Sequence, residues 1–111
     1  MNKILERLDL TIRGKTTESP NKSHTAKLLK KGTEKCAEKF GEEAIELIVA
    51  SVKKKKKEII GEAADTMYHM LVLLRSKDMI QRRDGWVLDN INLKIWKKVI
   101  WFMVQLNSKM T

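Results

Sequence analysis

Apolar residues recur every three or four positions through most of this chain, which is the spacing of helices that bury one face. The spacing predicts a first amphipathic helix over residues 2–13, carried by Ile4, Leu5, Leu8 and Ile12. The polar, turn-rich stretch Gly14–Ser23 predicts a loop. A second short helix is predicted over Thr25–Lys31, where Gly32 provides a C-terminal stop.

A long helix is predicted from Glu34 to Val52, with Thr33 as its N-terminal cap. Its apolar residues form two stripes, one of Ile45, Ile48, Val49 and Val52, the other of Cys36, Phe40, Ala44 and Leu47. A helix that is apolar on two sides is expected to lie wedged among neighbours in a bundle. Gly41 costs this helix about 1 kcal/mol relative to alanine, which indicates tight packing or close approach of a ligand there.

A second long helix is predicted over Lys57–Ser76, after the lysine run Lys53–Lys57, which we interpret as a solvated connection. Its apolar residues again cover more than one side. The segment from Asp78 onward carries all three tryptophans, and its apolar spacing predicts a last helix with Ile91, Ile95, Val99, Phe102 and Leu106 on one face. Such a surface needs a partner, either the bundle of this chain or a second copy.

Acidic residues lie among the apolar positions of both long helices. Each cluster alone could be a solvated helix face, but both have apolar flanks, where unpaired carboxylates are costly. Carboxylates that converge between two helices repel one another unless a cation neutralises them, and such hard oxygen ligands suit Mg²⁺ or Mn²⁺. We therefore predict one metal site formed by Glu42, Glu43, Glu46, Glu62 and Asp65.

Lysines on the same face as the first acidic cluster indicate phosphate chemistry. Lys35 and Lys39 can bind phosphates as point charges, while a metal polarises a phosphoryl oxygen and orients a water molecule. The pattern leaves open which carboxylate accepts the proton of that water, so the catalytic set is Glu43, Glu46, Glu62 and Asp65.

Three further residues are interpreted more modestly. His69 lies on the face of the second acidic cluster and is either a core histidine or a contact of the acidic site. Cys36 is expected to be a small core residue rather than a nucleophile, because no activating histidine can be placed beside it. Tyr68 is expected to pack with its hydroxyl hydrogen-bonded.

Composition narrows the class of protein. A chain of 111 residues with few glycines, prolines and aromatics favours one all-helical domain. The single cysteine excludes an internal disulfide, and neither a signal peptide nor a membrane-spanning run is visible, so we expect a soluble cytoplasmic protein. The net charge of +9 is compatible with an anionic small substrate or, as the weaker alternative, with a basic module that binds nucleic acid.

The acidic pattern also resembles a known superfamily. Glu43-x-x-Glu46, fifteen intervening residues and then Glu62-x-x-Asp65 resembles the all-α nucleotide pyrophosphohydrolases, which include the MazG-like enzymes. Residues 25–46 and 62–74 closely resemble the phosphoribosyl-ATP pyrophosphohydrolases of histidine biosynthesis. The resemblance implies a helical bundle completed by homodimerisation and Mg²⁺-dependent hydrolysis of phosphoribosyl-ATP to phosphoribosyl-AMP and pyrophosphate. It adds Lys31 to Lys35 and Lys39 as substrate-binding residues.

Two departures limit the resemblance. His24 stands where the family commonly has a bulky aromatic residue. The segment beyond Asp78 does not match, so we predict a family-like core over residues 1–78 and a divergent helical extension of the same domain over residues 79–111. The enzymatic alternative is a house-cleaning nucleoside triphosphate pyrophosphohydrolase on the same fold.

Overall fold

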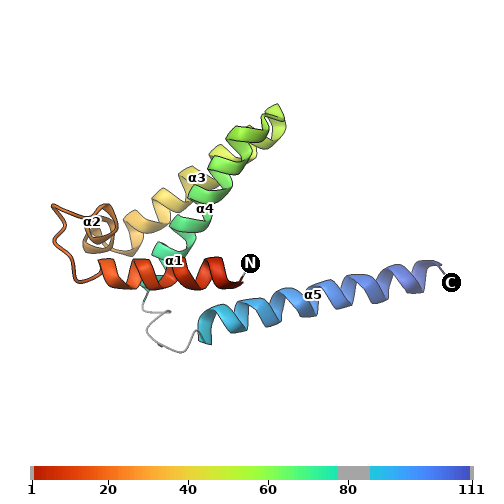
Figure 1. Cartoon of the computed structure of the whole chain (residues 1–111). Coiled ribbons are helices and arrows are strands. Elements are labelled where there is room, and N and C mark those ends of the chain that lie inside the picture. Colours follow the sequence, from red (N-terminus) through yellow and green to blue (C-terminus); the bar gives the residue numbers. More distant parts are fainter. Residues whose placement is uncertain (1, 78–85, 111) are drawn as a thin grey trace.

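The computed structural model describes residues 2–77 and 86–110 of the chain. Within these ranges all regular secondary structure is helical, which confirms the predicted all-α class (Figure 1), and the predicted loop before Thr25 is present over residues 16–23. Each helix predicted from the apolar spacing is present, and the last one is longer than its apolar pattern required. The five helices are α1 (Asn2–Lys15), α2 (His24–Lys31), α3 (Thr33–Lys53), α4 (Lys56–Ser76) and α5 (Trp86–Met110). The first residues of the predicted extension, 79–85, lie outside the described ranges.

Helices α3 and α4 form an antiparallel hairpin that is the centre of the fold (Figure 1). The lysine run makes the connection between them, as predicted. Lys54 adopts the left-handed conformation at φ 59° and ends α3, and α4 begins two residues later. All five lysines of the run are exposed, so the connection is solvated.

The short connection between α2 and α3 depends on a glycine. Gly32 has φ 96°, a conformation that residues with a side chain rarely adopt, and it ends α2 and precedes α3 directly. The prediction that Thr33 caps α3 is therefore wrong, because Thr33 is already the first helical residue. Its Oγ1 instead donates a hydrogen bond to the carbonyl oxygen of Ser76 at 3.3 Å, which ties the start of α3 to the end of α4.

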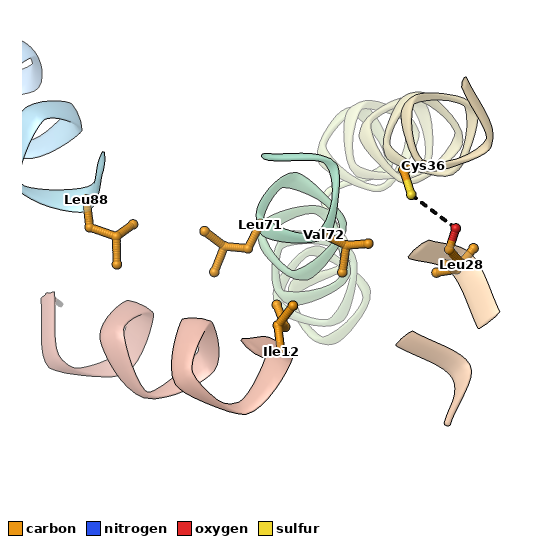
Figure 2. Packing of buried hydrophobic residues seen from close by; sticks show 6 residues of the cluster. All are labelled: Ile12, Leu28, Cys36, Leu71, Val72 and Leu88. Carbon is orange, nitrogen blue, oxygen red and sulfur yellow. Dashed lines mark hydrogen bonds between the residues drawn. The ribbon is translucent and has the colours of Figure 1, made fainter. Parts of the chain in front are cut away.

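The core lies where α1 and α2 pack against the end of the hairpin that is remote from the lysine connection (Figure 2). The thiol of Cys36 is fully buried there and donates to the carbonyl oxygen of Leu28 at 3.4 Å. Burial also raises the pKa of this thiol, and the position of Cys36 confirms it as a core residue. Nearby, the hydroxyls of Tyr68 and Thr25 are hydrogen-bonded to each other, also as expected. The core cluster consists of Ile12, Leu28, Cys36, Leu71, Val72 and Leu88.

A buried ion cluster joins α1 to α4, and the sequence analysis did not predict it. Asp9 is 3% exposed, and its two carboxylate oxygens accept hydrogen bonds from Arg13 at 3.3 Å and from Arg75 at 3.1 Å. Arg75 itself is nearly buried, with a side chain that is 10% exposed. Since charges removed from water must be paired, this cluster fixes how α1 lies across the hairpin.

Only one of the two apolar stripes of α3 is covered within this chain. Cys36 of the second stripe is in the core, whereas Ile45, Ile48, Val49 and Val52 of the first are between 45% and 76% exposed. The prediction that α3 is wedged on both sides is therefore wrong for a single copy. Gly41 is not tightly packed either, because a Cβ there would meet no described atom within 4 Å.

Among the described residues, the C-terminal helix α5 contacts the other helices near its start. Leu88 and Ile91 pack toward the core, and α1 is the helix that lies closest along α5. Beyond them both faces are exposed, including Trp96 and Trp101. None of the helices within the described ranges is long and apolar enough to cross a bilayer.

Candidate metal centre

The antiparallel packing of α3 against α4 brings three of the predicted carboxylates together. Glu43 of α3 and Glu62 and Asp65 of α4 each present a ligand atom, and these atoms all lie within 4.8 Å of one another. The hydroxyl of Thr66 lies 2.7 Å from the carbonyl oxygen of Glu62 and 3.2 Å from that of Glu43, so it holds the two helices together at this level. Thr66 was not among the predicted site residues, although it directly follows the acidic cluster of α4 on the helix.

The electrostatics of the group favour a bound cation. One carboxylate oxygen of Glu43 and one of Glu62 are buried and have no hydrogen-bond donor among the described residues. Burial, together with the charges of Glu46 and Glu43, raises the pKa of Glu62 to about 7. Burial and then the charges of Glu46 and Asp65 also raise the pKa of Glu43. Unsatisfied, mutually repelling carboxylate oxygens are the donor set that a hard divalent cation prefers.

The other two predicted carboxylate ligands lie at the edge of this group. Glu46 is exposed, and its charge raises the pKa of both Glu43 and Glu62, so it lies next to the centre. Glu42 is exposed and forms an ion pair with Lys39 at 3.2 Å. The structure therefore gathers Glu43, Glu62 and Asp65 and places Glu46 beside them.

The predicted phosphate-binding lysines are spread along α2 and α3. Lys39 pairs with Glu42, and this contact raises the pKa of Lys39. Lys35 pairs with Glu38 at 3.4 Å, and Lys31 is exposed in the last turn of α2. The ion pairs of Lys35 and Lys39 are partly exposed contacts within one helix, so both are weak.

His69 lies between the acidic group and the start of α2. It is 6% exposed, and its Nδ1 has no hydrogen-bond partner among the described residues. Burial and then the charges of Lys39 and His24 lower the pKa of His69, while that of Asp65 acts in the opposite direction. His69 is thus a buried histidine whose pKa is affected by charged groups on two helices, Asp65 on α4 and His24 on α2.

The raised pKa of Glu62 predicts a pH-dependent stability of the metal-free protein. A carboxyl whose pKa is 4.5 when unfolded and about 7 when folded binds its proton more tightly in the folded state. This contribution to stability is complete below pH 4.5 and is lost as the pH rises through 7. We expect the Tm of the metal-free protein to fall between pH 5 and pH 7.5, and Glu62→Gln to flatten that fall.

Calorimetry across this pH range, with and without saturating Mg²⁺, measures the effect. Mg²⁺ should raise Tm more at pH 7.5 than at pH 5.5, because the cation must displace the proton. Glu58→Gln, which changes an exposed glutamate of the same helix, should retain the wild-type profile. A wild-type profile in Glu62→Gln would contradict the assignment.

Comparison with known proteins agrees with the resemblance found in the acidic motifs of the sequence. The family model described as phosphoribosyl-ATP pyrophosphohydrolase matches residues 5–83. A protein of Dinoroseobacter shibae named phosphoribosyl-ATP pyrophosphatase is 47% identical over 90 residues, which cover 74% of this chain and 88% of the relative. Proteins of the same name from Paracoccus denitrificans (49% identity, covering 73% of this chain and 82% of the relative) and Ruegeria pomeroyi (51%, covering 68% and 72%) are also similar. The family match ends before α5 begins.

Proposed function

This chain belongs to the phosphoribosyl-ATP pyrophosphohydrolase family, and from that premise we propose that its acidic group binds the divalent cation used in catalysis. The chain is a hydrolase that converts phosphoribosyl-ATP to phosphoribosyl-AMP and pyrophosphate in histidine biosynthesis. We place the reaction in the cytoplasm, because the buried free thiol of Cys36 suits a reducing compartment.

The observation that carries the metal proposal is the pair of buried, unsatisfied oxygens of Glu43 and Glu62 within 4.8 Å of an oxygen of Asp65. These three residues would hold the ion, and Mg²⁺, with Mn²⁺ as a substitute, is the cation whose preference for carboxylate oxygen they meet. When bound, such an ion polarises phosphoryl oxygens and neutralises the charge that develops on the pyrophosphate.

The surrounding residues supply the proton transfer and the phosphate contacts. Glu46 is exposed beside the centre and outside the group of three, so we assign it as the base that accepts the proton of the attacking water. Lys35 and Lys39 lie one to two turns earlier on α3 and can exchange their weak ion pairs for the phosphates of the substrate. We also assign Lys31, which is exposed at the end of α2, as a contact of the substrate phosphates.

Pyrophosphate release tests the function directly. The purified chain should release pyrophosphate from phosphoribosyl-ATP with Mg²⁺ present, and chelation of the metal should stop the release. With dATP, dCTP and dUTP, turnover should be much slower. Equal or faster turnover of the deoxynucleotides would instead favour the house-cleaning alternative, and metal-independent release would remove the role of the acidic group.

We further propose that a second copy of the chain covers the first apolar stripe of α3. Ile45, Ile48, Val49 and Val52 form a continuous exposed row beside the acidic group, and an exposed apolar row of this kind marks an interface. The open space at Gly41, one turn earlier, lets another backbone approach closely. The site would then lie next to the interface of a homodimer.

Ile48→Asp should convert this dimer to monomers. Burying an unpaired carboxylate in an apolar interface costs several kcal/mol, and the side chain of Ile48 is 62% exposed in the single chain, so the fold itself should tolerate the change. Light scattering coupled to size exclusion measures the mass. Leu10→Asp, at an apolar residue of α1 that is 58% exposed, is the control and should leave the mass unchanged. A monomeric wild type would overturn the proposal.

We also propose that α5 extends the domain formed by residues 1–78 rather than forming a second one. Leu88 belongs to the core cluster together with residues of α1, α2, α3 and α4, and Ile91 packs against it. The start of α5 therefore shares the single core, and the remainder of the helix extends from it (Figure 1).

A further inference from the structure

A second polar site lies beside the start of α2. The turn that precedes this helix and its first residues enclose an open pocket of about 420 Å³, lined by Pro20, Asn21, Lys22, Ser23, His24 and Lys27. We propose that this pocket binds the 5-phosphate of the phosphoribosyl group, at the end of the substrate remote from the bond that is cleaved. The proposal rests on the proposed function, and it assigns a separate place to the part of the substrate that ATP lacks.

The positive charges of the pocket are available to an anion. Lys22 and Lys27 are exposed, and no acidic side chain in the described ranges forms an ion pair with either of them. Lys35 and Lys39, by contrast, already pair with neighbouring glutamates. A phosphate that enters the pocket therefore meets two ammonium groups without displacing an existing partner.

Hydrogen-bond donors complete the pocket. Ser23 is 6% exposed and lines the pocket, and its Oγ accepts the N–H of Ala26 at 3.1 Å. The hydroxyl proton of Ser23 has no acceptor among the described residues, so it can be donated to a phosphate oxygen. The N–H groups of Ala26 and Lys27 already donate to Ser23, so α2 contributes to the pocket chiefly through the dipole of its N-terminus, which favours negative charge and adds to the effect of Lys22 and Lys27.

The pocket and the acidic group are neighbours through the contact of α2 with α4. The hydroxyl of Thr25, the residue after His24 of the pocket, is hydrogen-bonded to that of Tyr68 on α4. Tyr68 lies three residues after Asp65 of the acidic group, about 4.5 Å along the helix axis. One extended ligand can thus reach both places.

The chemistry of phosphoribosyl-ATP fits two such sites. Its triphosphate and its ribose 5-phosphate are attached on opposite sides of the adenine base. Both ends are anionic, and because the base separates them they must bind at two different places. The triphosphate matches the metal-binding carboxylates with Lys35 and Lys39, and the remote monophosphate matches the basic pocket. Binding of the second phosphate would also explain preference for this substrate over ATP.

The test compares two doubly substituted variants. Lys22→Ala/Lys27→Ala removes the charges of the pocket, and Lys3→Ala/Lys30→Ala removes the same net charge from exposed positions elsewhere. The pocket variant should show a KM for phosphoribosyl-ATP raised about tenfold or more, with kcat changed less than twofold, because a uniform binding contact is lost. The control should stay within twofold of wild type in both constants.

A titration with ribose 5-phosphate, followed by amide NMR without divalent metal, separates the pocket from turnover. The amides of residues 23–27 should shift in the wild type and not in the pocket variant. Equal losses in both variants, or shifts confined to Lys35 and Lys39, would overturn the inference. If the wild type failed to release pyrophosphate from phosphoribosyl-ATP, the proposed function would fail, and the titration would still decide whether the pocket binds the phosphate.

Discussion

Asp65→Asn is expected to lower kcat for pyrophosphate release by about 10³-fold, while the helical content and the Tm of the metal-free protein are retained. The change removes one negative ligand from the group of three and keeps the size of the side chain. The expected loss is of the order found when one preorganised group that stabilises a transition state is removed. Stopped-time assays at saturating phosphoribosyl-ATP and saturating Mg²⁺ measure kcat without a limit from weakened metal binding.

Glu43→Gln should give a similar loss from the opposite helix, because Glu43 contributes one of the two buried, unsatisfied oxygens. Neither change should unfold the metal-free protein, since each removes a carboxylate that its neighbours repel. Glu58→Gln on α4 is the matched control and should keep the wild-type rate. Near-normal turnover in either Asp65→Asn or Glu43→Gln would show that these residues are not the metal ligands.

The acidic group could be anticipated because helix periodicity converts spacing into geometry. Glu62 and Asp65 are three residues apart and must share a face, and Glu43 comes from a helix whose short connection to α4 requires antiparallel packing. Which of the three predicted ligands of α3 (Glu42, Glu43 and Glu46) turns inward is decided by the rotation of α3 against α4. That rotation follows from contacts such as the one between Thr66 and the carbonyl oxygen of Glu43, which periodicity does not encode.

Helix periodicity does not predict the ion-pair partners of the lysines or the position of the basic pocket. The spacing of Lys35 and Lys39 predicts that they lie near the acidic cluster. It does not predict that they pair with Glu38 and Glu42, because several acidic partners lie within reach of each lysine. The pocket at Lys22 and Lys27 depends on the path of a turn, which has no period to project. His24 was the one signal in the sequence that pointed there, as a departure from the family pattern.

Burial was predicted least well. Apolar spacing predicts that a helix face is buried, but it does not predict whether the same chain or a second copy buries it. The sequence therefore predicts an apolar row from Ile45 to Val52 and apolar faces on α5, as observed, but a single copy of the chain leaves them exposed. The ion cluster of Asp9 was missed for a related reason, since Arg75 is 66 residues away and a single aspartate on a short amphipathic helix resembles a surface residue.

Asp9→Asn is expected to lower the free energy of unfolding by about 3–5 kcal/mol, the usual result when one partner of a buried ion pair is removed. The change breaks the ion pair of Asp9 with the Arg75 guanidinium, whose side chain is 10% exposed. A domain of this size has a total stability of about 5–15 kcal/mol, so the variant should unfold at a much lower urea concentration. Urea titrations followed by circular dichroism, at fixed protein concentration and without metal, measure the difference.

Two further variants separate a buried pair from a surface contact. Glu18→Gln removes an ion pair with Lys15 in which both side chains are 42% exposed, and it should cost less than about 0.5 kcal/mol. Asp9→Asn combined with Arg75→Met should be more stable than Asp9→Asn alone, because the second change removes the buried charge whose ion pair with Asp9 the first has broken. If the double variant were the less stable of the two, Asp9 would act through packing of α1 alone. Recovery in the double variant would show instead that the two charges are coupled, so that the Asp9–Arg75 pair joins α1 to α4 of the α3–α4 hairpin.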